Sequence, residues 1–171
     1  GAKEIHAFEP IARICAILRK NIEASQFDNV TAWHCAVGQS DTFAEIQDPG
    51  GDAPTSASLS TEFSKSHLST TTPTRIQVVA VDSWAEVNGI HAIDLIKLDV
   101  EGYEEFALRG MAEIIRRDRP VILIEVLDEF EERIRTVVDQ VFGFGYSWNR
   151  IDEGSRTHSR NVLLVPEDAT R

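Results

Sequence analysis

Three carboxylate residues stand near the ends of predicted β-strands, at Glu9, Asp99 and Glu125. An acid inside a buried strand is costly unless it is paired or reaches water. In open α/β sheets with parallel strands, ligands bind in the crevice beyond the carboxyl ends of the strands, where such an acid reaches solvent. The three positions therefore predict a site at one edge of a sheet, with chemistry based on carboxylates.

Lys97 and Glu101 extend the second of these acids into a cluster. Side chains alternate between the two faces of a strand, so Lys97, Asp99 and Glu101 share one face where their strand ends. Lys97 could neutralise a neighbouring carboxylate or hold an oxyanion of a substrate. The alternative is a structural ion pair between Lys97 and Asp99, with Glu125 capping a neighbouring helix, because ion-pair networks also occur without a catalytic role.

The elements that position these residues alternate between strands and helices. Apolar patterning predicts strands at residues 4–8, 30–37, 42–46, 76–81, 93–100, 121–126, 146–151 and 161–165, and helices at 11–22, 82–87, from 103 onwards, and at 129–142. The central order of strand, helix, strand and helix predicts parallel strands covered by helices on both faces. The last two strands predict an antiparallel hairpin at the edge. The 171 residues fit a single domain.

A loop is expected between residues 47 and 75, where turn residues give way to a stretch rich in serine and threonine. A loop of this length inside a compact domain is usually functional or mobile. Gly50 and Gly51 predict a tight turn within it. Further along the chain, Asp82 and Ser83 predict the N-terminal cap of a short helix, which Asn88 and Gly89 end.

The composition excludes several classes of protein. A net charge of −11 disfavours a nucleic-acid partner, because phosphate binding needs clustered lysine and arginine. No stretch approaches the roughly 20 apolar residues of a membrane span, and no signal peptide opens the sequence. Two cysteines, Cys15 and Cys35, lack any paired spacing and predict buried, reduced thiols in a cytoplasmic protein.

Other catalytic and metal-binding patterns are missing. The five histidines are His6, His34, His67, His91 and His158, and they lack metal-ligand spacing, so no metal site is predicted. The sequence also contains no Gly-x-Ser-x-Gly elbow, which argues against a serine hydrolase.

Several motifs, in order along the chain, resemble those of the FkbM-type methyltransferases. They are Ala7-Phe8-Glu9-Pro10, Ala36-Val37-Gly38, Lys97-Leu98-Asp99-Val100-Glu101-Gly102, Leu108-Arg109-Gly110 and the strand from Pro120 to Glu125. The third motif is the most distinctive, and the resemblance extends from about Glu4 to Val165. It implies a Rossmann-like class I methyltransferase fold that uses S-adenosylmethionine, with methyl transfer to a hydroxyl oxygen of a sugar or another natural product.

The resemblance also assigns roles to single residues. Glu9 and Pro10 would bind the cofactor, with Glu9 at the ribose, and Ala36 and Val37 would line the adenine pocket. Asp99 would lie near the methyl donor. Asp99 or Glu101 could supply the base that activates the hydroxyl of the acceptor. The acceptor would be a small molecule or a glycan.

Two further residues are expected to contact the substrate. Ser58 belongs to a segment, Ser56–Ser60, that resembles the family's border of the active site. Glu125 would support the acceptor from the flanking strand.

The sequence departs from the family pattern at its beginning. The family's first strand, glycine-rich loop and first helix would precede Glu9, so we expect a truncated form that binds the cofactor weakly or not at all. The strands on either side of the missing one would be left with unpaired hydrogen-bonding groups. A further segment, a second subunit in a homodimer, or direct pairing of the two strands could fill the gap. The alternative function is a non-catalytic Rossmann-like remnant that acts as a homodimer or interaction module.

Overall fold

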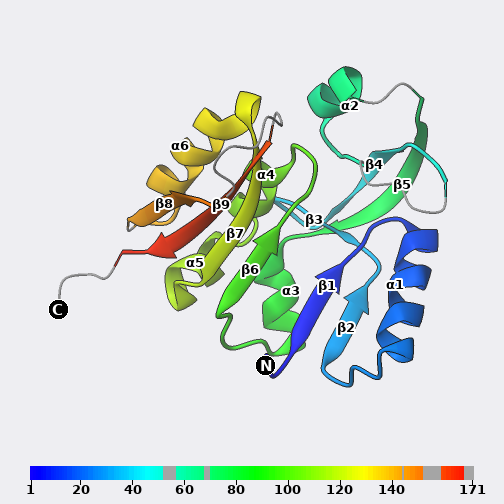
Figure 1. Ribbon diagram of the computed structural model, residues 1–171, viewed down its shortest axis with the longest axis horizontal. Coiled ribbons are helices and arrows are strands. Elements are labelled where there is room, and N and C mark those ends of the chain that lie inside the picture. Colours follow the sequence, from blue (N-terminus) through cyan, green and yellow to red (C-terminus); the bar gives the residue numbers. More distant parts are fainter. Residues whose placement is uncertain (52–56, 68–69, 144, 152–158, 168–171) are drawn as a thin grey trace.

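The computed structural model describes residues 1–51, 57–67, 70–143, 145–151 and 159–167 (Figure 1). Its strands are β1 (Ile5–Phe8), β2 (Val30–Trp33), β3 (Ala36–Val37), β4 (Thr42–Asp48), β5 (Thr72–Val79), β6 (Leu95–Leu98), β7 (Val121–Leu127), β8 (Tyr146–Arg150) and β9 (Ser159–Pro166). Its helices are α1 (Ala12–Ala24), α2 (Thr61–His67), α3 (Val81–Asn88), α4 (Glu104–Arg109), α5 (Ala112–Asp118), the 3-10 helix η1 (Asp128–Phe130) and α6 (Glu131–Val141). The strands form three hydrogen-bonded groups, in the orders β1-β2, β3-β5-β4 and β6-β7-β9-β8.

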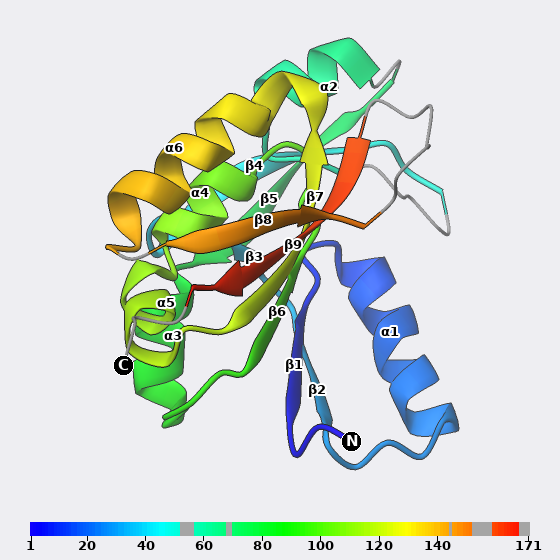
Figure 2. The same ribbon diagram turned by 60° about the vertical axis from the view of Figure 1, so that its left-hand side comes forward.

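The four-stranded group carries the main core. The apolar run of β7 alternates, so Ile122, Ile124 and Val126 are fully buried while the residues between them are half-buried. Leu108 of α4 and Ile134 of α6 belong to the same buried cluster. In Figure 2 the helices α3 to α6 lie on one side of the strands and α1 lies on the other. This arrangement confirms a mixed α/β fold.

Strand directions differ from the expected, mostly parallel sheet. β1–β2, β3–β5 and β6–β7 are parallel, whereas β4–β5, β7–β9 and β8–β9 are antiparallel. The β8–β9 hairpin was expected, but the β4–β5 ribbon was not. This ribbon forms because Ile46, Ile76 and Val78 alternate to one face and pack against Ile11, in a second buried cluster with Ala36.

Two predicted elements have different boundaries in the structure. The strand expected at 30–37 bends at His34 and Cys35, so its first half pairs with β1 and its second half with β5. The loop expected at 47–75 contains helix α2 and the first residues of β5. The hydroxyl of Ser60 accepts a hydrogen bond from the Phe63 amide at 3.1 Å, which stabilises the first turn of α2.

Asp82 caps a different helix from the one expected. Its carboxylate accepts the backbone N–H groups of Glu113 and Ile114, at 3.0 and 2.9 Å, and so caps α5 rather than its own helix α3. The structure also divides the helix expected from residue 103 into α4 and α5, with Gly110 between them. Gly89 ends α3, as predicted, and the structure shows it in a left-handed conformation.

β1 and β6 lie side by side in both views, but they belong to different sheets (Figures 1 and 2). Direct pairing of these two strands is therefore not observed. Within the described residues, each has one edge without a strand partner. The β1–β2 pair packs on α3 through rings instead: His6, Phe8 and Trp33 surround Trp84 at centroid distances of 4.8, 4.9 and 5.3 Å.

The structure also bears on the two cysteines and on membrane-spanning helices. Cys15 and Cys35 are buried and free of disulfides, as predicted. No helix in the described part of the chain has the length and apolar character needed to cross a membrane.

Candidate active site

A cavity of about 230 Å³, here called the strand-end cavity, opens where β1, β3 and β6 end. Glu9, Asp99 and Glu101 line it, so two of the three predicted strand-end acids face the same space. Parallel strands end at one edge of the fold, which is why residues about 90 positions apart in the sequence meet here.

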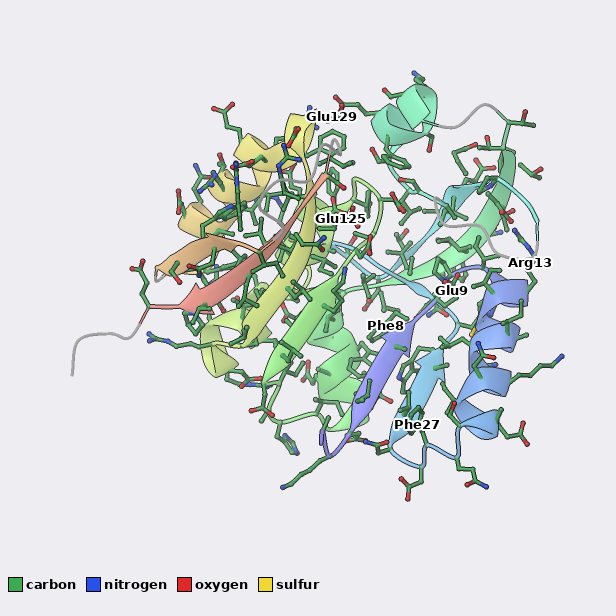
Figure 3. The ribbon with its side chains drawn as sticks, in the orientation of Figure 1. Phe8, Glu9, Arg13, Phe27, Glu125 and Glu129 are labelled. Atoms are coloured by element: carbon green, nitrogen blue, oxygen red, sulfur yellow. The ribbon has the colours of Figure 1, made fainter. Side chains whose placement is uncertain are left out.

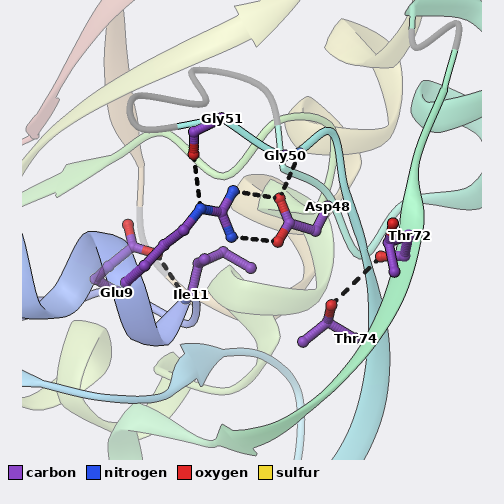
Figure 4. Close-up of polar contacts among 8 residues, drawn as sticks. Glu9, Ile11, Asp48, Gly50, Gly51, Thr72 and Thr74 are labelled. Carbon is purple, nitrogen blue, oxygen red and sulfur yellow. Dashed lines mark hydrogen bonds and ion pairs between the residues drawn. The ribbon is translucent and has the colours of Figure 1, made fainter.

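Glu9 joins the end of β1 to the start of α1. Its Oε1 accepts the Ile11 backbone N–H at 2.7 Å (Figure 4). Burial raises the pKa of the Glu9 carboxyl, and the hydrogen bond from Ile11 partly offsets that rise. The second carboxyl oxygen has no hydrogen-bond partner within the described part of the chain. That oxygen is available to accept a hydrogen bond from a ligand hydroxyl.

Arg13 and Asp48 form a bidentate ion pair beside the strand-end cavity, which the sequence did not indicate (Figure 4). The distances from Nη1 to Oδ2 and from Nη2 to Oδ1 are 2.5 and 2.7 Å. The guanidinium also donates from Nε to the Gly51 carbonyl at 2.7 Å, and Asp48 accepts the Gly50 N–H at 2.8 Å. The hydrogen bond from Arg13 holds the pKa of Asp48 below its usual value. The pair therefore ties α1 to the end of β4.

Lys97 and Asp99 form the ion pair that was the structural alternative. Lys97 Nζ lies 3.0 Å from Asp99 Oδ2, and the two side chains are 45% and 42% exposed. Asp99 lines the cavity, whereas Lys97 is not among the lining residues. An exposed pair of this kind adds little stability, so its main effect is to orient Asp99 and partly neutralise it.

Glu101 has the most unusual surroundings of the five predicted acidic and basic residues. Burial raises the pKa of its carboxyl to about 7, and the charges of Asp99, Glu125 and Glu104 contribute to the same rise. Its backbone is left-handed, with φ of 54°, which is uncommon for a residue other than glycine. A carboxyl that titrates near neutral pH at the edge of a cavity is suited to general-base chemistry.

Ser58 and Glu125, predicted to contact substrate, lie outside the strand-end cavity. The Ser58 side chain is fully buried, and its hydroxyl donates to the Glu101 carbonyl at 2.6 Å, so it supports the strained turn. Glu125 lies on β7, away from Glu9 and Arg13 (Figure 3), and its charge helps to raise the pKa of Glu101. Ser56, at the start of the same predicted border segment, lies outside the described residues.

Apolar residues form the remaining wall of the strand-end cavity. Pro10, Ala36 and Val37, the residues expected to bind the cofactor, line it together with Ile11 and Ile14. Short aliphatic side chains next to a carboxylate provide a surface for a flat ring and an acceptor for hydroxyl groups. No group of three or more His, Cys, Asp or Glu residues in the described ranges is arranged to hold a metal ion.

Comparison with known proteins identifies the family of the chain. The family described as the methyltransferase FkbM domain matches residues 1–147. The chain belongs to the FkbM methyltransferase family. The predicted resemblance to this family is therefore confirmed.

A solved structure supports the fold of this FkbM-family chain. The chain resembles the crystal structure of the methyltransferase FkbM from Methylobacillus flagellatus KT, with a TM-score of 0.61 and 14% sequence identity. The match covers 95% of this chain and 36% of that protein, so the chain spans about a third of its length. At this identity the likeness concerns the fold alone. No curated protein matches the chain in sequence.

Sequence reasoning missed several residues around this FkbM-family site. Arg13 and Asp48 are 35 residues apart, and no local pattern links them. Tyr103 lines the strand-end cavity directly after the distinctive motif, where only the start of a helix was predicted. Glu104 is buried at the same turn, and its acidic side chain in the first helical turn was the available signal.

Proposed function

We propose that this chain binds S-adenosylmethionine in the strand-end cavity and transfers a methyl group to a hydroxyl oxygen, with Glu101 as the general base. The observation that carries this proposal is that Glu101, whose pKa is raised to about 7, lines the same cavity as Glu9 and Asp99. A hydroxyl on a sugar or another natural product is the proposed acceptor.

The residues of the cavity fit such a cofactor by their chemistry. The second carboxyl oxygen of Glu9 would accept a hydrogen bond from a ribose hydroxyl, next to Pro10. Ala36 and Val37 would contact the adenine ring, and the carboxylate of Asp99 would face the cationic end. When bound, the cofactor supplies an electrophilic methyl carbon on a sulfonium, whose carbon–sulfur bond breaks with the electron pair left on sulfur.

Glu101 would accept the proton of the acceptor hydroxyl. Its ionised carboxylate accepts a hydrogen bond from the hydroxyl and takes the proton as that oxygen bonds to the methyl carbon. The hydrogen bond from Ser58 to the Glu101 carbonyl keeps the turn in place, so the carboxyl stays at the edge of the cavity. Because Lys97 pairs with Asp99, we assign the base to Glu101 and orientation to Lys97 and Asp99.

Calorimetric titration with S-adenosylhomocysteine tests the cofactor cavity. We expect weak but measurable binding, and a further loss of roughly ten- to a hundredfold in Glu9→Ala, since one hydrogen bond to a charged group is worth about 1.5–3 kcal/mol. Glu86→Ala is the matched control, because Glu86 is an exposed carboxylate on α3 outside the cavity.

The possible results of this titration separate two questions. If wild type and Glu9→Ala bind equally, or if wild type shows no binding at millimolar ligand, the proposed cofactor cavity is wrong. Micromolar binding of S-adenosylhomocysteine would contradict only the expectation that this polypeptide binds its cofactor weakly and is catalytically impaired. That expectation, like the cytoplasmic location inferred from Cys15 and Cys35, stays a prediction.

A further inference from the structure

The turn that follows β6 presents Glu101 in an unfavourable backbone conformation. Glu101 and Gly102 are two successive left-handed residues, with φ of 54° and 84°. Glycine adopts this conformation freely, but glutamate does so only where the surrounding structure holds it. Residues 100–102, here called the Glu101 turn, therefore need contacts that fix their backbone.

Glu104 holds the N–H groups of the Glu101 turn. Its side chain reaches back from the first turn of α4, and its Oε1 accepts the backbone N–H groups of Val100 and Gly102, at 3.1 and 3.2 Å. These two residues flank Glu101, so a single oxygen joins the backbone on both sides of it. Glu104 is only 3% exposed, so little water competes for these hydrogen bonds.

Ser58 holds the other side of the same turn. Its hydroxyl donates to the Glu101 carbonyl at 2.6 Å and accepts the Ser60 backbone N–H at 2.8 Å. Ser58 therefore fixes the carbonyl of Glu101 but neither of the flanking N–H groups. Those two groups depend on Glu104.

The contact made by Glu104 does not require its negative charge. Burial raises the pKa of Glu104, which favours the protonated carboxyl. A carboxyl group keeps one oxygen as an acceptor in both protonation states. Oε1 can therefore accept the two N–H groups in either state, whereas Oε2 is buried without a hydrogen-bond partner among the described residues. A glutamine side chain carries an equivalent acceptor.

We propose that Glu104 is a positioning residue for Glu101: its Oε1 joins the N–H groups on both sides of Glu101 and so keeps that carboxyl at the strand-end cavity. The importance of this contact for methyl transfer rests on the function proposed above, whereas the contact itself does not. The alternative is that Glu104 only stabilises the start of α4.

Amide hydrogen exchange, measured by NMR on the full chain without ligands, tests the contact. Glu104→Met fills a similar volume without an acceptor, and Glu104→Gln keeps the acceptor. We expect Glu104→Met to speed exchange at Val100 and Gly102 roughly tenfold or more, and Glu104→Gln to change it much less. Glu105→Ala is the matched control, because this neighbouring carboxylate on α4 pairs with Arg109 at 3.1 Å instead.

Two comparisons separate this role from the alternative. A role in α4 alone would speed exchange of the Ala107 amide, which donates to the Tyr103 carbonyl, as much as exchange in the Glu101 turn. Wild type gives a test that no variant can spoil by failing to fold. Its Val100 and Gly102 amides should exchange more slowly than the Glu101 amide between them, which has no acceptor among the described residues.

NMR titration of the Glu101 carboxyl tests its position. The charges that act on it belong to Asp99, Glu125, Glu104 and Lys97. Glu104→Gln and Glu104→Met both lack the Glu104 charge, so a difference between them reports where Glu101 lies. We expect the pKa of Glu101 to fall further in Glu104→Met, from about 7 towards 4.5, because a released carboxyl gains contact with water.

Three results would overturn the proposal: unchanged exchange at Val100 and Gly102 in Glu104→Met, equal acceleration at Ala107, or the same Glu101 pKa in both variants. With an acceptor available, Glu104→Met should lower kcat roughly ten- to a hundredfold with little change in the KM for S-adenosylmethionine, and Glu104→Gln should retain most of the rate.

The outcome is separable from that for the proposed function, because the exchange and titration experiments use neither cofactor nor acceptor. The expected exchange and pKa changes without any binding of S-adenosylhomocysteine would support the positioning role and reject the methyltransferase function. Binding of S-adenosylhomocysteine together with unchanged exchange in Glu104→Met would reject the positioning role and leave the methyltransferase function standing.

Discussion

At the scale of single residues, Glu101 combines a partly buried carboxyl with a left-handed backbone. Burial and neighbouring acids favour its protonated form, so its pKa is raised to about 7. A base must be ionised to accept a proton, so any methyl transfer that depends on Glu101 should increase as pH rises through this value.

Glu101→Gln tests this role. Once an acceptor is available, we expect the variant to lose most of its methyl-transfer rate, by roughly 10²–10⁴-fold for a lost general base. The remaining rate should no longer rise across neutral pH, which a pH profile of kcat would show. If the variant retains both the rate and the pH dependence of wild type, the general base is a residue other than Glu101.

The same residue predicts how stability changes with pH. The folded-state pKa is raised from 4.5 to about 7, so its contribution is fully present below pH 4.5 and is lost as pH rises towards 7. Across this window we expect wild type to lose on the order of 1–3 kcal/mol relative to Glu101→Gln. Urea unfolding of both proteins at the two ends of the window measures the difference, and a constant difference would contradict the prediction.

The residue scale also shows what a sequence can predict about a site. The position of Glu9 and Asp99 at strand ends was enough to predict that they lie close together, and both line the strand-end cavity. This prediction was possible because their location depends only on where the strands end. Ser58 shows the limit of such reasoning, because its hydroxyl points to the Glu101 backbone. The direction of a side chain depends on tertiary contacts that the sequence does not display.

At the scale of elements, the turn between β6 and α4 borders the strand-end cavity. Gly102 adopts φ of +84°, and a Cβ at this position would lie 2.7 Å from the Phe130 ring and 3.0 Å from Phe63 Cβ. Glycine is therefore required both by its backbone conformation and by its close contacts.

Gly102→Ala should destabilise the fold by more than the roughly 1–2 kcal/mol of left-handed strain alone. Gly89→Ala is a suitable control, since Gly89 has φ of +68° and a Cβ there would meet no described atom within 4 Å. Thermal unfolding of both variants separates strain from crowding. Equal losses would mean that Phe130 moves aside without cost.

The ion pair between Arg13 and Asp48 joins α1 to β4, and Arg13→Ala tests its strength. We expect a loss of about 1–3 kcal/mol in the free energy of unfolding at neutral pH, because Asp48 would remain buried without its partner. Arg116→Ala, which breaks an exposed pair with Glu113, should cost less than about 1 kcal/mol.

Acid should remove the effect of the Arg13 substitution. The pKa of Asp48 is lowered from 3.8, so its stabilising effect is present above that pH and is lost as pH falls below it. The difference between wild type and Arg13→Ala should therefore shrink in acid denaturation experiments. A difference that is independent of pH would mean that Arg13 acts through packing or its other contacts.

Among the elements, those with a regular apolar pattern were the predictable ones. The expected strand at 121–126 corresponds to β7, and the expected helix at 11–22 overlaps α1. Helix α2 was missed because Phe63 is its one large apolar residue, so no periodicity marks it. Its local signals were the cap at Ser60 and the acidic Glu62 in its first turn. The β4–β5 ribbon could not be predicted, because pairing between strands that far apart leaves no local pattern.

At the scale of the whole molecule, the edges of β1 and β6 remain open within the described residues. Leu95 on β6 is 63% exposed and Ile5 on β1 is 43% exposed. Exposed edges with apolar side chains favour association with another strand. We propose that a second copy of the chain can cover them in a homodimer.

Leu95→Lys tests this assembly. A charge at the open edge should shift the mass measured by light scattering from dimer to monomer, while Val87→Lys, on the exposed face of α3, should not. A monomeric wild type, or a dimer that persists in Leu95→Lys, would rule out association through this edge.

The ring cluster around Trp84 has a spectroscopic consequence. Two indoles, Trp33 and Trp84, lie at 5.3 Å and 81° to each other, whereas Trp148 lies elsewhere, under Arg135. Such a pair should give an exciton couplet in the far-ultraviolet circular dichroism, and that couplet should vanish if β1–β2 separated from α3. Because Phe8, which contacts Trp84, directly precedes Glu9, the molecule carries its own optical reporter one residue from the proposed ribose contact.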